Sequence, residues 1–118
     1  MQNENKDLKP RTKKFALRII KMYCALPTTT VAQVLGKQVL RSGTSVGANY
    51  REANRARSKV EFISKMGDCL KELDETAYWL ELLVESGIVR QTTMAELLNE
   101  TDQLTAIFVT IINKAKNP

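Results

Sequence analysis

The chain has 118 residues, of which 43% are hydrophobic and 26% charged, as is typical of one soluble globular domain rather than a disordered chain. It contains no histidine, which excludes mechanisms that use an imidazole as base, acid or metal ligand. The net charge is +5, but it is unevenly placed: residues 1–59 hold thirteen Lys or Arg and three acidic residues, whereas residues 60–118 hold five and ten.

The two cysteines, Cys24 and Cys69, show no metal-ligand spacing. We expect both to be reduced apolar residues of a cytoplasmic protein. No apolar run approaches the roughly 18 residues that would span a membrane. The first apolar stretch is interrupted by Arg18 and Lys21, which makes it a poor signal peptide. The sequence therefore predicts a soluble protein that has no cofactor, no metal and no membrane partner.

The opening stretch from Met1 to Lys9 is polar and aperiodic, and we expect a mobile polar and basic tail over 1–11. The first helix is predicted over about 12–26 and ends because a proline, Pro27, pushes its preceding residue out of the helical region. Its apolar positions are spaced four, three and four, and they are Phe15, Ile19, Met22 and Leu26.

The second helix is predicted over about 31–57, after a capping box at Thr30–Gln33. Its seam alternates by four and three and consists of Leu35, Val39, Ser42, Val46, Asn49, Ala53 and Ala56. Gly36, Gly43 and Gly47 share another face of this helix. Each costs about 1 kcal/mol in a helix interior, so we expect close approach of another helix there, from this chain or from a neighbouring subunit.

The third helix is predicted over about 59–86, between a capping box at Ser58–Glu61 and a left-handed cap at Gly87. Its repeat is Ile63, Met66, Leu70, Leu73, Ala77, Leu80 and Val84. The fourth helix is predicted over about 94–116, after a capping box at Thr93–Glu96. It buries Met94, Leu97, Thr101, Leu104, Phe108, Ile111 and Ala115. No segment alternates with period two, so the sequence predicts an all-α fold over 12–118, an antiparallel up-down-up-down four-helix bundle.

Polar residues interrupt the seam of the second helix, where each unpaired buried group would cost about 1–3 kcal/mol. A hairpin that closes at Arg57 and Ser58 brings Arg41 and Ser42 close to Leu73, and hence near two carboxylates. We interpret the set as a structural polar core that fixes helix register, as a buried Asn does in coiled coils. The set consists of Arg41, Ser42, Ser45, Asn49, Glu52, Glu72 and Glu75. The alternative, a small-molecule or catalytic site, lacks a second acidic cluster.

Three stretches of these helices carry a resemblance: Arg41–Ala53, Ser58–Ile63 and Lys71–Leu80. Together they are similar to the bacterial four-helix-bundle proteins, also called 23S rRNA-intervening-sequence proteins, over about residues 12 to 115. The core of the resemblance, a Ser-Val-Gly-Ala-Asn run that begins at Ser45 and is followed by Glu52-Ala53, is fairly specific. The motif residues that the family shares fall on the polar core, and they are Ser45, Asn49, Glu52 and Glu75.

The resemblance implies an all-helical protein that assembles as a ring-shaped homo-oligomer, commonly a pentamer. It implies no established enzymatic activity and no catalytic residues. A related barrel-like pentamer serves diversity-generating retroelements as an accessory protein that binds nucleic acid and reverse transcriptase. The resemblance therefore implies that the protein is not an enzyme and leaves its partners open.

Basic residues on the first two helices predict a surface for phosphate backbones, which need charge at helical spacing rather than base readout. Four of them are spaced three, four and three beside the first apolar face. The predicted nucleic-acid-binding residues are Arg11, Lys14, Arg18, Lys21, Lys37, Arg51 and Arg55. Tyr23 and Tyr50 could stack bases. Because no RNA-binding motif is present, we expect binding of RNA or DNA to be salt-sensitive and weakly sequence-specific.

Tyr78, Trp79 and Leu82 lie off the seam of the third helix. An apolar patch centred on a Trp usually marks a protein contact, so we interpret these residues as an oligomer interface. The alternative is a wide core stripe in which Trp79 covers the end of the bundle. The leading functional hypothesis is a non-enzymatic oligomer that binds RNA or DNA. The other is a protein-protein interaction scaffold or accessory subunit without nucleic-acid binding.

Overall fold

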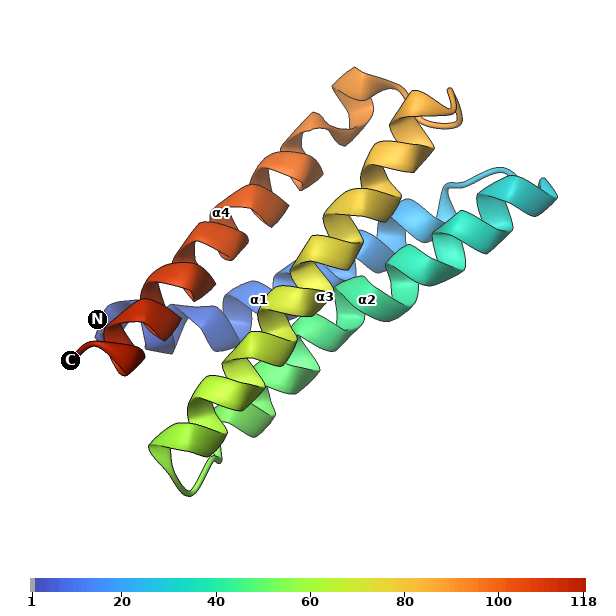
Figure 1. The fold of residues 1–118 in the computed structure, drawn as a ribbon. Helices are drawn as coiled ribbons and strands as arrows, with labels where there is room; N and C mark the ends of the chain where they lie inside the picture. The colour runs from blue at the N-terminus through green and yellow to red at the C-terminus, as the bar shows by residue number, and fades with distance from the viewer. Residues whose placement is uncertain (1) are drawn as a thin grey trace.

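The computed structural model describes residues 2–118, with side chains from Leu8 onward. Four helices follow one another: α1 (Gln2–Cys24), α2 (Thr30–Asn54), α3 (Lys59–Glu85) and α4 (Gln91–Lys116). They form an elongated body of 46 × 22 × 20 Å (Figure 1). No strand occurs in the part of the chain that the structure describes. The predicted all-α fold of four helices is confirmed.

Each helix packs along the next one in the chain, and α2 and α3 share the largest contact. Between α1 and α2, Tyr23 meets Gln33 near the turn that joins the two helices, and Thr12 meets Gly47 farther away. By contrast, α1 and α4 touch over a short stretch only. Figure 1 shows α4 diverging from α1 toward the N-terminal end of α4. The fold is therefore open along its α1–α4 edge.

Helix α1 begins ten residues before the predicted start, so the expected tail over 1–11 is wrong for the described residues 2–11. Pro10 lies inside the helix, where a proline removes one backbone hydrogen bond. The helix continues because its apolar face continues: Leu8 is buried one turn before Thr12 and two turns before Phe15. Burial of Leu8 compensates for the backbone hydrogen bond that Pro10 cannot donate. A prediction based on Pro10 alone does not take this burial into account.

The ends of α2 are also shifted relative to the prediction. Its N-cap is Thr29 rather than Thr30, with the Thr29 hydroxyl accepting a hydrogen bond from Ala32 N. Gln33 instead accepts from the Tyr23 hydroxyl at 2.9 Å and donates to a backbone oxygen. The helix ends at Asn54, three residues early, because the Arg55 N–H turns back to backbone oxygens within the last turn.

The predicted caps of α3 are present. Ser58 accepts a hydrogen bond from Glu61 N at 3.1 Å, and Gly87 has a φ of +81°. Ile88 N then donates to Leu83 O, which closes the helix with the Schellman pattern. Helix α4 starts three residues before the predicted position, and its N-cap residue Arg90 makes no side-chain cap bond. The capping box predicted for α4 is therefore wrong.

Helix α2 is buried on two faces, because it packs against both α1 and α3. Val39, Ser42, Val46 and Ala53 of its predicted seam are buried. Tyr50 lies off that seam yet is 0% exposed, and its ring meets Phe108 edge-on with centroids 5.9 Å apart. None of the helices described is long and apolar enough to cross a membrane.

The glycine face of α2 is the contact with α1 of the same chain. A Cβ at Gly36 would lie 2.9 Å from Tyr23 Cδ1, and one at Gly43 would lie 2.7 Å from Ile19 Cγ1. At Gly47 the nearest atom would be Thr12 Oγ1, at 3.2 Å. The prediction of close helix approach at these glycines holds, and α1 is the approaching helix.

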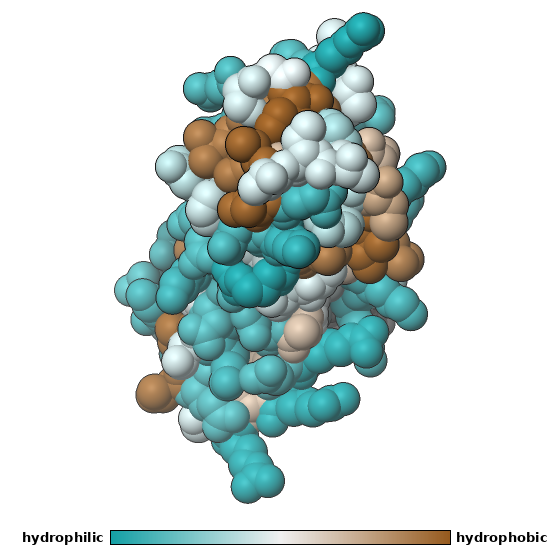
Figure 2. Space-filling model, turned by 90° about the vertical axis from the view of Figure 1, so that its right-hand side faces the viewer, coloured by the Kyte–Doolittle hydropathy of each residue, from teal (hydrophilic) through white to brown (hydrophobic). Residues whose placement is uncertain are grey.

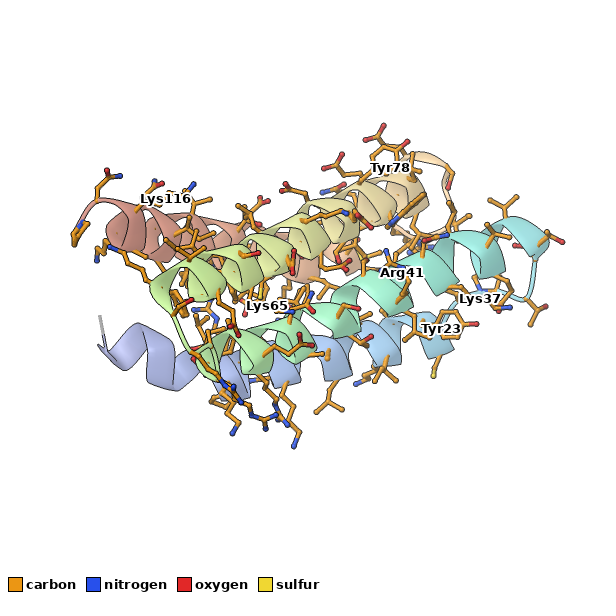
Figure 3. All side chains as sticks on the ribbon, turned by 60° about the horizontal axis from the view of Figure 1, so that its bottom comes forward. Tyr23, Lys37, Arg41, Lys65, Tyr78 and Lys116 are labelled. Carbon is orange, nitrogen blue, oxygen red and sulfur yellow. The ribbon has the colours of Figure 1, made fainter. Side chains whose placement is uncertain are left out.

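Polar groups join α2 to α3 at one central position. The Ser42 and Thr76 hydroxyls lie 2.8 Å apart and are buried, and Thr76 also donates to Glu72 O. Beside them, Arg41 bonds Glu75 at 2.6 Å and Glu72 at 3.3 Å, and Figure 3 shows Arg41 pointing from α2 toward α3. The helix register predicted from a hairpin that closes at Arg57 and Ser58 therefore brings Arg41 and Ser42 of α2 next to Glu72 and Thr76 of α3.

The remaining members of the predicted polar core lie outside it. Glu52 is exposed and forms an ion pair with Lys65 at 2.9 Å. Ser45 donates to Arg41 O within its own helix, and Asn49 is half-buried. The prediction that Glu52 belongs to the polar core is wrong, because Glu52 lies on the side of α2 that faces solvent next to α3. Thr76, which the sequence analysis does not single out, completes the buried pair.

Candidate nucleic-acid interface

The predicted basic stripe on α1 faces α4. The Arg11 guanidinium donates to both oxygens of Glu100, each at 2.8 Å, and to Gln103 Oε1 at 3.0 Å. Lys14 and Arg18 line a shallow hollow beside the same carboxylate. Arg11 is therefore engaged in the α1–α4 contact. The negative charge of Glu100 on α4 lies against the basic stripe, and the spacing of residues along α1 does not reveal it.

The electrostatics of Glu100 reflect this setting. The hydrogen bond from Arg11 holds the pKa of the Glu100 carboxyl below its ordinary value of 4.5, with partial burial opposing the shift. The nearby charges of Arg11, Arg18 and Lys14 act in the same direction as the hydrogen bond. Three cations thus stabilise one carboxylate at the place where α1 and α4 meet.

Acid is expected to loosen the α1–α4 contact. Because the pKa of Glu100 is lowered on folding, its contribution to stability is complete above 4.5 and is lost as pH falls through the folded-state pKa. Glu100→Gln should remove this contribution, and the loss should stay below about 1 kcal/mol because the pair is partly hydrated. Urea unfolding of both proteins at neutral and acidic pH checks the prediction. Equal pH dependence of the two would contradict it.

A second cationic cluster, which we call the α1–α2 cluster, consists of Lys9, Lys13 and Arg51. These three side chains line a cleft of about 250 Å³ between α1 and α2, together with Gly47 and Thr44. Lys9 and Lys13 are four residues apart and so share one flank of α1. Gly47 lets Thr12 approach α2 closely, and this approach brings the Lys flank next to Arg51.

The α1–α2 cluster is open and carries no neutralising partner within residues 8–118. Lys9, Lys13 and Arg51 are exposed, and no carboxylate of the described side chains lies within 4.0 Å of them. The Thr44 hydroxyl donates to Leu40 O, so it is already used within its own helix. The cleft thus offers positive charge with little capacity to read bases.

Other predicted cations extend this surface along α2. Lys37 is exposed and lies fourteen residues before Arg51, which places both on one face of the helix. Figure 3 shows Lys37 pointing away from the bundle. Arg55 is exposed at the C-terminal end of α2. Lys21, by contrast, lines a groove between α1 and α4. The predicted set is therefore divided between two faces of the molecule.

Lys9 and Lys13 are absent from the set predicted from sequence. Their spacing of four residues is visible there, but Lys9 falls in the segment expected to be a tail. Only a helix that extends before Pro10 places Lys9 in register with Lys13. The signal that could have revealed this is Leu8, which extends the apolar spacing of α1 toward its N-terminus.

The expected stacking role of Tyr50 is wrong, because its ring is buried between helices. Burial also raises the pKa of the Tyr50 hydroxyl above its ordinary value, while a hydrogen bond with Asn54 opposes the shift. Tyr23 is half-buried, and its hydroxyl donates to Gln33. Neither ring supplies a stacking surface at the α1–α2 cluster.

The predicted interface residues differ in exposure. Tyr78 is 55% exposed, and Figure 3 shows it pointing outward near the end of α3. Trp79 is half-buried and packs against the core, and its Nε1 is buried with no hydrogen-bond partner among the described residues. Leu82 is half-buried. Exposed Val31 and Val34 begin α2 at the same end, where Figure 2 shows apolar surface gathered.

Comparisons with known proteins agree on one group. A sequence profile of the 23S rRNA-intervening sequence proteins matches residues 4–110. The fold is similar to the crystal structure of a protein of unknown function from the S23 ribosomal protein family of Bacteroides thetaiotaomicron. The two chains share 37% identity with a TM-score of 0.87, over 93% of this chain and 98% of that one. No protein of curated function matches the sequence.

Proposed function

Since the chain belongs to the 23S rRNA-intervening sequence protein family, we propose that it is a non-enzymatic oligomer that binds RNA or DNA through a basic surface with low sequence specificity. The protomer of this proposal is an up-down-up-down bundle, and its assembly is the ring of five copies that the resemblance implies. It acts in the cytoplasm, where its two unpaired thiols remain reduced.

The observation that carries the proposal is the α1–α2 cluster. Two lysines of α1 and Arg51 of α2 converge on one cleft, with no carboxylate among the described side chains to neutralise them. Such a row of cations can pair with successive phosphate groups of a nucleic-acid strand. Each phosphate that is bound releases counterions, and this release favours binding. Lys37 and Arg55 continue the row toward both ends of α2.

The low sequence specificity follows from what the cleft lacks. Apart from the three cations it is lined by small residues and by two Thr hydroxyls, each of which donates to a carbonyl of its own helix. Base readout needs several amide or guanidinium groups aimed at base edges, or free aromatic faces, and the cleft offers a single guanidinium, that of Arg51. With Tyr50 buried, the cluster supplies charge but no stacking platform.

A non-enzymatic role is supported by the nucleophiles that are present. The buried thiol of Cys69 has its pKa raised to about 12 by burial, so it stays protonated at neutral pH. Cys24 is exposed, but the chain has no histidine to act as its base. Among the described residues, no three His, Cys, Asp or Glu side chains gather in a metal-binding arrangement.

The proposal is tested by fluorescence polarisation with labelled structured RNA and duplex DNA of equal length, titrated with salt. We expect log affinity to fall linearly with log salt, with a slope that counts the phosphates engaged. The tighter of the two ligands identifies the preferred nucleic acid. If neither ligand binds at low salt, nucleic-acid binding is overturned and the scaffold hypothesis takes its place.

A further inference from the structure

The open α1–α4 edge contains a groove of about 700 Å³ at the end where α1 finishes and α4 begins. Its apolar wall includes Met22, Val89 and Met94, and its rim carries three cations. These are Arg18, Lys21 and Arg90. No carboxylate of the described side chains lies within 4.0 Å of any of them. The groove thus combines apolar surface with a net positive charge, because three cations and one carboxylate, that of Glu96, line it.

A complementary surface lies on α3, which we call the α3 stripe. Tyr78, Leu82 and Glu85 follow one another at intervals of four and three residues, with Glu81 beside them. Asp74 extends the stripe by one turn. Tyr78 and the three carboxylates are exposed, and no cation of the described residues pairs with these carboxylates. The α3 stripe therefore combines apolar side chains with three free negative charges.

We propose that the α3 stripe of one copy of this chain docks into the α1–α4 groove of the next copy. Tyr78 and Leu82 enter the apolar groove, while the carboxylates of the stripe face Arg18, Lys21 and Arg90. The inference rests on the oligomer of the proposed function and assigns its two contacting surfaces. Because these surfaces differ, the contact is head-to-tail, which is the kind of contact from which a ring of identical copies is built.

The chemistry of the groove favours a second copy over a nucleic acid. Its apolar wall carries no aromatic ring, so it offers bases nothing to stack on. A Tyr anchor set in an apolar pocket and surrounded by complementary charge is the usual composition of a protein contact.

Two variants test the groove and the α3 stripe independently. Arg18→Glu with Arg90→Glu makes the groove acidic and leaves the stripe intact, whereas Tyr78→Glu removes the anchor and leaves the groove intact. We expect wild-type protein to be a multimer by size-exclusion chromatography with light scattering, and each variant alone to have the 13.3 kDa mass of one chain. Val60→Glu, at a 79% exposed site at the other end of α3, is the control and should retain the wild-type size.

Mixing the two variants gives the decisive result. Each retains one competent surface, so an equimolar mixture should form a complex of two chains and no larger species. A monomeric wild-type protein would overturn the oligomer itself. A multimeric wild type whose size survives both changes would overturn only the surfaces assigned here. Monomeric variants that fail to pair on mixing, with unchanged thermal unfolding, would overturn the head-to-tail contact.

Discussion

Gly43→Leu is expected to lower the free energy of unfolding by about 3 kcal/mol, because overpacking a tight helix contact forces backbone shifts. A Cβ at this position would lie 2.7 Å from Ile19 Cγ1 and 3.0 Å from Ile19 Cγ2. Both atoms are bonded directly to the Cβ of a fully buried side chain, so they cannot swing away. Helix α1 would have to move outward, and the leucine branches would increase that movement.

Gly67→Ala is the matched control. Gly67 lies in the interior of α3, and a Cβ there would meet no atom within 4 Å. Alanine should therefore raise the free energy of unfolding by about 0.5–1 kcal/mol through helix propensity alone. Urea unfolding followed by circular dichroism measures both changes. Equal midpoints for the two variants would show that α1 does not pack on the glycine face of α2.

Removing the α1–α2 cluster should weaken nucleic-acid binding by more than about 100-fold at 0.1 M salt, because each released counterion contributes roughly one power of ten. The variant is Lys9→Ala, Lys13→Ala, Arg51→Ala. All three side chains are exposed, so the fold should be retained. The slope of log affinity against log salt should fall by about three, one for each phosphate that is no longer bound. Polarisation titrations over a salt series measure both quantities.

The control for this variant removes the same charge elsewhere. Lys71→Ala, Lys114→Ala, Lys116→Ala changes three exposed lysines of α3 and α4 and removes the same three positive charges from a net charge of +5. Its affinity and salt slope should stay close to those of the wild type. Similar reductions in both triple variants would mean that net charge, rather than the α1–α2 cluster, governs binding.

The helices and much of their packing could be predicted from sequence, because periodicity reports on contacts that repeat along a single element. The spacing of apolar residues is enough to predict the seam of α3, and the spacing of glycines is enough to predict the close contact on α2. Tyr50 could not be assigned this way: α2 is buried on two sides, and a single seam accounts for only one. The start of α1 could not be predicted because Pro10 is a strong local signal, whereas the burial of Leu8 depends on tertiary packing.

The candidate site was predictable in charge but not in position. Spacing placed Arg11 and Lys14 on one flank of α1, but only the position of α4 shows that Glu100 faces them. The convergence of Lys13 with Arg51 depends on the approach of α1 to Gly47, which is set by the crossing of two helices. Helical spacing along one segment contains no information about either neighbour.

The location of the nucleic-acid site is tested most directly by lysine acetylation footprinting, with mass spectrometry of the protein alone and bound to structured RNA. We expect Lys9 and Lys13 to lose reactivity on binding, while Lys71 and Lys116 react equally in both states, since these two lie on α3 and α4. Unchanged reactivity at Lys9 and Lys13, with protection elsewhere, would contradict the assignment of phosphate binding to the α1–α2 cluster.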